Sequence, residues 1–206
     1  MEYLAELKAW NARGNLVSQA DVPRLVSRHV AESLAAVPLI DRIHPTQVLD
    51  LGSGGGFPIV PIKLARPELQ VALVEARHLK SLFLRRVRER LDLRGFWVWN
   101  MRAEVLAGLP VAAQGASLEA ASASANEGVP TMRPIVDLVT VRAVASLSEL
   151  TRWSESLIAS GGHLLAFKGS RLDQELAEWK TDPRGWSLED VVPLSPEIRI
   201  VLFRRS

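Results

Sequence analysis

The sequence predicts an α/β fold: a Rossmann-like, mostly parallel sheet with an antiparallel last strand and an N-terminal helical extension. Three observations predict it. Short apolar runs alternate along the chain with segments whose apolar residues recur at helical spacing. A glycine-rich turn follows the first of these runs, residues 48–51. The second run, residues 71–74, ends in an acid, Glu75, roughly 20 residues beyond the glycines.

Length and composition are those of a globular protein with one main core. The chain has 206 residues, of which 48% are hydrophobic and 23% are charged. This is enough for one α/β domain and a small extension. We expect the extension at residues 1–45 and the sheet domain at residues 46–206. Residues 110–134 are small, polar and aperiodic, and they predict a flexible insertion within that domain.

Composition also excludes several kinds of protein. No stretch approaches the ~20 apolar residues that span a bilayer, and the N-terminus lacks a signal-peptide profile. We therefore expect a cytoplasmic protein without a membrane partner. The absence of cysteine removes disulfides, thiolate metal sites and cysteine nucleophiles, and no metal site is expected. The formal charge of +2 does not by itself indicate a nucleic-acid partner.

Residues 1–36 carry two apolar faces at helical spacing. Leu4 and Leu7 belong to the first, and Leu25 belongs to the second. Asp21 is placed to cap the start of the second helix.

The glycine turn, residues 52–56, has the composition of a ligand-binding loop. Gly52, Gly54 and Gly56 permit positive φ angles and let a ligand touch the main chain. Pro58 is the expected first residue of a helix, where its missing N–H costs nothing. The sequence therefore predicts strand, glycine turn and helix N-terminus, the arrangement of a nucleotide-type site.

Residues 77–91 predict a helix with one apolar stripe and many arginines on its other side. This basic face is either solvated or turned toward phosphates, and the sequence leaves both interpretations open. A third strand is predicted at residues 96–100. Glu104 follows it, either as an acceptor for the base of a bound nucleotide or as a helix-start acid near the positive end of the helix dipole.

The second half of the predicted sheet delivers two cations to the edge where a ligand would bind. The fourth strand, residues 135–140, is followed by Arg142, and the fifth, residues 163–167, by Lys168. The remaining predicted elements are a helix at 147–159 that ends at Gly161–Gly162, a helix at 171–180, and strands at 186–192 and 197–203.

Asp50, the glycine turn and Glu75 together resemble the S-adenosylmethionine site of Rossmann-like methyltransferases. The pattern is Asp-x-Gly-x-Gly-x-Gly, followed by an acid at the end of the next strand. In that resemblance Asp50 orders the loop near the methionine end of the donor. Ser53 and Gly54 belong to the loop itself, and Glu75 accepts the ribose hydroxyls.

The chain as a whole resembles the bacterial small-subunit (16S) ribosomal RNA guanine-N7 methyltransferases, also called the glucose-inhibited division protein B family. The resemblance runs from Trp10 to the final strand. Its marks, in order, are Trp10-Asn11, Asn15-Leu16, Arg28-His29, Ser33, residues 50–54, residues 56–58, Lys80, Phe83-Leu84, Arg102-Ala103-Glu104, Arg142-Ala143 and Lys168-Gly169. Each mark alone is unspecific, whereas the ordered set is specific.

The resemblance implies a cofactor, a donor site and a partner. The cofactor is S-adenosyl-L-methionine, and the partner is the small ribosomal subunit with its RNA. Carried over by position, the donor site comprises Gly52, Phe57, Ala103, Glu104 and Arg142.

The implied chemistry needs no acid–base pair. Guanine N7 is a lone pair without a hydrogen, so its methylation requires alignment and exclusion of water rather than a general base. No catalytic residue is therefore expected, and Arg142 is a candidate orienting group. Arg28, His29 and Lys168 are candidate contacts to RNA.

Two departures from the family pattern keep other functions open. Ile59 stands where the family usually has glycine and is expected to narrow the loop, and Val141 stands where the family usually has serine. The alternatives are a methyltransferase of small molecules, and a donor-binding but inactive protein of RNA binding or assembly.

Overall fold

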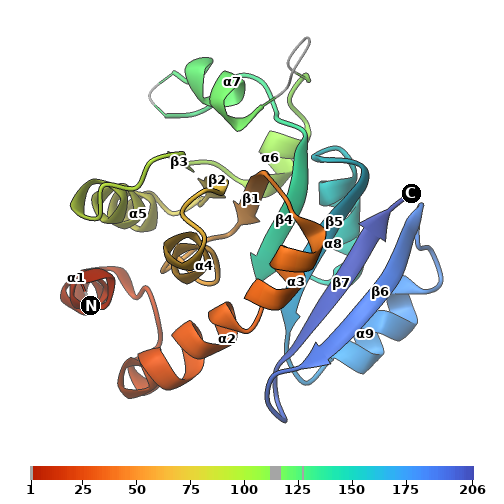
Figure 1. The fold of residues 1–206 in the computed structure, drawn as a ribbon, viewed down its shortest axis with the longest axis horizontal. Coiled ribbons are helices and arrows are strands. Elements are labelled where there is room, and N and C mark those ends of the chain that lie inside the picture. The colour runs from red at the N-terminus through yellow and green to blue at the C-terminus, as the bar shows by residue number, and fades with distance from the viewer. Residues whose placement is uncertain (1, 112–116, 127) are drawn as a thin grey trace.

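A central sheet organises the chain (Figure 1). The computed structural model describes residues 2–111, 117–126 and 128–206. Within these residues seven strands pair in the order β3-β2-β1-β4-β5-β7-β6. They span Gln47–Leu51 (β1), Gln70–Val74 (β2), Phe96–Trp99 (β3), Val136–Arg142 (β4), Ile158–Lys168 (β5), Trp186–Pro193 (β6) and Arg199–Arg205 (β7).

Strands β1 to β5 run parallel to one another, and β7 is antiparallel to both β5 and β6. The predicted fold class is confirmed, including the antiparallel last strand. The order places this last strand inside the sheet, so that β6 rather than β7 forms the edge.

Helices lie on both sides of the sheet (Figure 1). In the described residues they are Glu2–Gly14 (α1), the 3-10 helix Gln19–Arg24 (η1), the π-helix Leu25–Val30 (η2), Ala31–Leu34 (α2), Val37–Ile43 (α3), Ile59–Ala65 (α4), His78–Arg90 (α5), Ala103–Ala107 (α6), Leu118–Ala123 (α7), Leu147–Glu155 (α8) and Leu172–Trp179 (α9). In this part of the chain, no helix has the length and apolar character to cross a lipid bilayer.

Alternate side chains along each strand pack into two hydrophobic cores, one on each face. In β1, Val48 belongs to the core shared with α1, α3, α4 and α5, whereas Leu49 and Leu51 belong to the core shared with α6 to α9. Because both faces are covered, the parallel strands are apolar at nearly every position. In β1 the polar residues are Gln47 at its start and Asp50, which is buried near the carboxyl end of the strand.

The N-terminal extension starts its second helical segment earlier than predicted. Ser18, and not Asp21, caps η1, since its Oγ accepts a hydrogen bond from the Asp21 N–H at 3.2 Å. The prediction of Asp21 as the cap is wrong because the serine three residues before it begins a 3-10 turn. The Asp21 carboxylate instead accepts hydrogen bonds from the Ser18 hydroxyl and from Arg28.

The glycine pair Gly161–Gly162 lies within β5 and does not end a helix. Helix α8 already ends at Glu155, and β5 begins at Ile158. The register of β5 against β4 shifts between Val136 and Leu138, which leaves a bulge in β5. A methyl group built on Gly162 would lie 2.8 Å from Asp137 O, so the glycine is required by the bulge.

The region predicted as a flexible insertion contains a helix that the sequence did not predict. Ser117 caps α7, and Leu118 and Ala121 are fully buried at helical spacing. The Leu118 N–H also donates to Gln47 Oε1 at 2.7 Å, which joins α7 to the start of β1. Residues 112–116 and 127 lie outside the described residues, and the predicted domain division stays a prediction.

Candidate functional site

The carboxyl ends of the parallel strands meet at one edge of the sheet, and the strand order reverses between β1 and β4. The loop after β1, residues 52–58, therefore lies beside the ends of β2 and β4. The Gly52 and Ser53 N–H groups both donate to Val74 O, at 2.8 and 3.2 Å, and fix the loop to the end of β2. Pro58 precedes α4 as its cap, so the helix begins one residue later than predicted.

The glycines of this loop have positive φ angles and different surroundings. The φ angles are +70° at Gly52, +54° at Gly54 and +89° at Gly56. A methyl group built on Gly52 would lie 2.5 Å from Val144 Cγ2, and one on Gly56 would lie 2.7 Å from Val60 Cγ2. The nearest atom to a methyl group built on Gly54 would be Gly52 O, at 3.8 Å. The loop is therefore open to a ligand at Gly54 and closed by side chains at the other two glycines.

Glu75 follows β2 and faces the glycine loop. Its side chain is buried, and its Oε2 accepts from the Gly54 N–H at 2.8 Å while Oε1 accepts from the Arg77 N–H at 2.8 Å. Each carboxylate oxygen can accept a further hydrogen bond. Asn100, at the end of β3, donates to Glu75 O at 2.8 Å and supports the same turn. A ligand hydroxyl placed at Gly54 would meet an acceptor that is already held in position.

Asp50 is buried beside the same loop. Thr140 Oγ1, from β4, donates to Asp50 Oδ1 at 2.6 Å, whereas Oδ2 has no hydrogen-bond partner among the described residues. Burial raises the pKa of the Asp50 carboxyl to about 7; the hydroxyls of Ser53 and Thr140 oppose this, and the Glu75 charge adds to it. A buried carboxyl oxygen without a partner is a feature that a bound ligand can satisfy.

The predicted donor residues follow the ends of four neighbouring strands. Ala103 and Glu104 lie in the first turn of α6, after β3; Ala103 is buried, and the Glu104 side chain is 46% exposed, 3.5 Å from Arg102. Arg142 lies at the end of β4, on the other side of the glycine loop.

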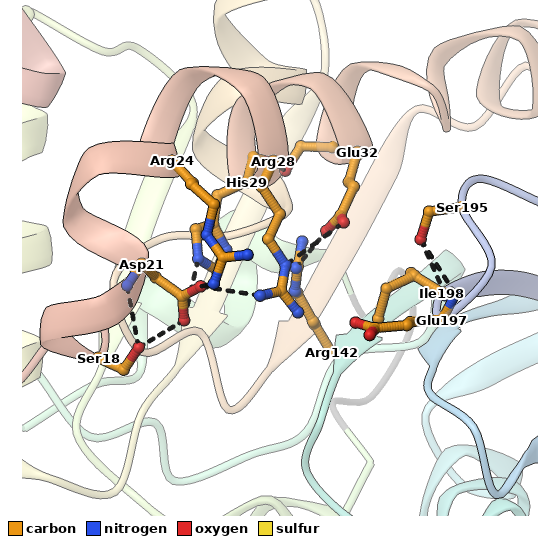
Figure 2. A network of polar contacts seen from close by, with 11 residues as sticks. Ser18, Asp21, Arg24, Arg28, His29, Glu32, Arg142, Ser195, Glu197 and Ile198 are labelled. Atoms are coloured by element: carbon orange, nitrogen blue, oxygen red, sulfur yellow. Dashed lines mark hydrogen bonds and ion pairs between the residues drawn. The ribbon is translucent and has the colours of Figure 1, made fainter.

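Arg142 pairs with an acid of the N-terminal extension (Figure 2). Its Nη2 donates to Glu32 Oε2, and the two side chains are 13% and 10% exposed. The guanidinium also lies over the Phe167 ring, 5.7 Å from its centroid. Its Nη1 has no hydrogen-bond partner in the part of the chain described. Arg28 extends the network, with its Nη1 2.8 Å from Asp21 Oδ1 and its Nε 3.7 Å from Glu32 Oε1.

A cavity of about 780 Å³ opens at the ends of β4 and β5. Its walls carry mixed charges and two rings: Arg28, Arg142, Lys168, Arg171, Glu149, Glu175, Glu178, His29 and Phe167. Of the nine predicted donor residues, all of which are described, only Arg142 lines it. The glycine loop and the cavity are neighbouring sites, since Val144 lines the cavity and a methyl group built on Gly52 would lie 2.5 Å from its Cγ2.

The sequence matches the rRNA small subunit methyltransferase G family over residues 1–196. The chain belongs to this family. It is 39% identical over 175 residues to a ribosomal RNA small subunit methyltransferase G of Roseiflexus castenholzii, an alignment that covers 84% of this chain and 65% of the relative. A protein of the same name from Janthinobacterium sp. is 31% identical over 215 residues, covering 100% of this chain and 84% of the relative.

The solved structures agree with the fold. A putative O-methyltransferase from Klebsiella pneumoniae matches with a TM-score of 0.62 at 13% identity, covering 99% of this chain and 90% of that one. At this identity the likeness shows the fold alone. Family membership makes the chain an S-adenosylmethionine-dependent methyltransferase of ribosomal RNA.

His29, one of the family marks, joins the cavity to the glycine loop. Its ring stacks on Phe57 with centroids 5.0 Å apart and lines the cavity. Neither ring nitrogen has a hydrogen-bond partner among the described residues, although Nε2 lies 3.7 Å from Asp21 Oδ2. Burial first, and then the Arg142 charge, lower the pKa of His29, so the ring is neutral at pH 7.

Lys168 is buried and already has partners. Its Nζ donates to Ala145 O at 2.7 Å and lies 2.5 Å from Glu175 Oε2. Glu175 also accepts from the Leu147 N–H at 3.0 Å. Together these two side chains hold the loop after β4 against β5 and α9. The predicted contact of Lys168 with RNA stays a prediction, and it would require Lys168 to leave these partners.

The two departures from the family pattern lie in the hydrophobic cores. Ile59 is fully buried in the core beneath α4, and Val141 is buried in the core on the other face. The space at Gly54 is bordered by Gly52 O and Lys80 rather than by Ile59. The expectation that Ile59 narrows the loop is therefore wrong, because its side chain turns into the core.

Several residues of the site escaped sequence reasoning. Tyr3 donates to Gly55 O at 2.5 Å, and Thr140 supports Asp50 from the neighbouring strand. Neither contact leaves a local pattern in the sequence. Glu32 did carry a signal, since an acid four residues after Arg28 on a helix predicts an ion pair there.

Proposed function

We propose that the protein transfers a methyl group from S-adenosylmethionine to N7 of a guanine in the RNA of the small ribosomal subunit. The observation that carries the proposal is Glu75, a buried carboxylate fixed by the Gly54 amide beside the open part of the glycine loop. Family membership supports ribosomal RNA as the substrate class, and the names of the relatives support the small subunit. Those relatives are bacterial, which supports action in the cytoplasm, where bacterial ribosomal subunits are found.

The donor site in this proposal extends along four strand ends. When bound, the donor supplies an electrophilic methyl group on a sulfonium centre. Glu75 accepts its ribose hydroxyls, and the carboxyl of Asp50 faces its methionine end. The residues proposed to hold the donor are Asp50, Gly52, Ser53, Gly54, Phe57, Glu75, Ala103, Glu104 and Arg142.

The cavity beside Arg142 is the proposed acceptor site. Guanine N7 carries no hydrogen, so the residues around it have to orient the base and exclude water rather than accept a proton. A neutral His29 and a cationic Arg142 fit this requirement. Arg142 Nη1 is buried beside the cavity and has no hydrogen-bond partner among the described residues, so the proposal assigns it to guanine O6, which leaves N7 exposed. Arg28 on the cavity wall suits a phosphate.

Methyl transfer from the donor to small ribosomal subunits tests the proposed function. Small subunits from a strain lacking this methylation are incubated with the protein and tritiated S-adenosylmethionine, and the modified base is mapped. We expect label at N7 of one guanine, and a loss of label with the Glu75→Gln variant. Label on a metabolite or protein alone would overturn the proposal. Donor binding by calorimetry without any transfer would favour an inactive RNA-binding protein.

A further inference from the structure

Tyr3 connects the N-terminal helix to the glycine loop. It is the only tyrosine of the chain, lies in the first turn of α1 and is 4% exposed. Its hydroxyl donates to Gly55 O at 2.5 Å, across 52 residues of sequence. Its ring packs edge-on against Phe57, with centroids 5.6 Å apart. One side chain of the extension thus contacts both the backbone and the aromatic ring of this loop.

The rest of the extension packs on the same part of the loop. A methyl group built on Gly55 would lie 3.3 Å from Leu16 O and 3.5 Å from Leu7 Cδ1. One built on Gly56 would lie 3.1 Å from Tyr3 Oη. The extension therefore supplies the nearest atoms at Gly55, and at Gly56 it adds Tyr3 to a closer contact with Val60 Cγ2 of α4 at 2.7 Å, whereas Gly54 faces open space.

These contacts fix the loop from two sides. The Gly54 N–H is held by Glu75, and the Gly56 N–H donates to Ser53 O at 2.7 Å. The Gly55 carbonyl between them is held by Tyr3. Three successive glycines have wide conformational freedom, so a loop of this composition needs external contacts to keep one shape.

We infer that Tyr3 is a positioning residue for the methyl donor, and that the N-terminal extension is a structural part of the donor site. The inference rests on the proposed function, since it takes the ligand of the glycine loop to be the donor. The Tyr3 hydroxyl holds the Gly55 carbonyl and thereby the orientation of the Gly54 backbone toward the donor. Loss of the hydroxyl leaves the ring packed on Phe57 and removes one of the two bonds of the Gly55–Gly56 peptide, which is then held only through the Gly56 N–H bond to Ser53 O.

The test removes the hydroxyl alone with Tyr3→Phe. We expect the Kd for S-adenosylmethionine and for S-adenosylhomocysteine, measured by calorimetry, to rise about 3- to 10-fold, the effect of one buried hydrogen bond. The KM for the donor should rise by a similar factor, while kcat at saturating donor should stay within about 2-fold. Hydrogen exchange of the amides in residues 52–58 should become faster.

The matched control is Thr151→Val. Thr151 Oγ1 is buried on α8 and donates to Leu147 O at 3.0 Å, so this variant also loses a buried hydroxyl bound to a carbonyl. It should leave donor Kd and exchange in residues 52–58 unchanged. An unchanged donor Kd in Tyr3→Phe, or an equal rise in both variants, would overturn the inference. Failure of the unaltered protein to bind the donor would instead defeat the proposed function.

Discussion

Two carboxylates flank the glycine loop, and their surroundings give them different roles. Glu75 accepts two backbone N–H groups, so the loop needs an acceptor at this position. Among the described residues, Thr140 donates to one carboxyl oxygen of Asp50 and the other oxygen has no hydrogen-bond partner, and burial brings the Asp50 pKa to about 7. The first carboxylate is built to hold the loop and a ligand hydroxyl, whereas the second can change its charge near neutral pH.

Asp50→Asn should flatten the pH dependence of stability. Because the Asp50 pKa is raised from 3.8 to about 7, the folded protein keeps a proton that the unfolded chain loses between these values. The stability from neutral Asp50 is therefore complete below about pH 4 and is lost as the pH rises toward 7. The loss is at most about 4 kcal/mol. Asparagine has no such proton. Urea unfolding of the unaltered protein and the variant at about pH 5 and about pH 8 measures how the free energy of unfolding changes with pH. The same change in both proteins would contradict the prediction.

Glu75→Gln should weaken donor binding far more than Glu104→Gln. A glutamine places an N–H₂ group against the Gly54 or Arg77 N–H and loses the charge that strengthens both bonds. We expect the donor Kd to rise about 10- to 100-fold, the value of a hydrogen bond to a charged group. The Glu104 side chain is 46% exposed, so Glu104→Gln should raise the donor Kd by less than about 3-fold. Calorimetry measures the donor Kd of each variant. A larger rise in Glu104→Gln than in Glu75→Gln would mean that Glu75 is not the acceptor for the ribose hydroxyls.

At the scale of elements, the loop after β4 is held from β5 and α9 by the Lys168–Glu175 pair. Lys168→Met and Glu175→Gln should each lower the free energy of unfolding by about 3 kcal/mol, because either change leaves a charge that is at most 14% exposed without its partner. The double variant should lose at least about 1 kcal/mol less free energy of unfolding than the sum of the losses in the two single variants. Urea unfolding of the four proteins closes this cycle.

The same variants test whether Lys168 contacts RNA. If Lys168 bound a phosphate, Lys168→Met would lower the salt dependence of small-subunit binding by about one unit of slope, and Glu175→Gln would not. An unchanged slope in both variants would contradict the predicted RNA contact and would mean that Lys168 stays with Ala145 O and Glu175.

The elements that the sequence predicts well are those whose pattern is local. Strands buried on both faces need continuous apolar runs, and parallel order fixes where their ends meet, so Glu75 and Arg142 could be assigned to one edge. The prediction that Gly161–Gly162 ends a helix is wrong, because glycines serve both helix ends and bulges and here they lie in the bulge of β5. The bond from Tyr3 to Gly55 O joins distant segments and leaves no trace in either one.

At the scale of the whole molecule, the positive charge is concentrated on one helix. The formal charge is only +2, yet the stretch from Arg77 to Arg94 contains two acids, Glu89 and Asp92, against Arg77, Lys80, Arg85, Arg86, Arg88, Arg90 and Arg94. Helix α5 packs beside α1, and Glu6 lies 3.9 Å from Arg86 and 3.7 Å from Arg90. Its basic side is exposed at the β3 edge of the sheet.

Arg88→Ala together with Arg94→Ala should weaken binding to small subunits in a salt-dependent way. If this face lies on RNA phosphates, each lost contact lowers the slope of log K against log salt by about 0.7 to 0.9. The donor Kd should not change, because both arginines are exposed and lie in or beyond the last turn of α5, whereas the glycine loop borders Lys80 in the first turn of that helix. Arg184→Ala is the matched control, an exposed arginine next to β6 at the opposite edge of the sheet. It should leave the slope intact. Equal slopes in all three proteins would mean that the α5 face is solvated and does not contact RNA phosphates.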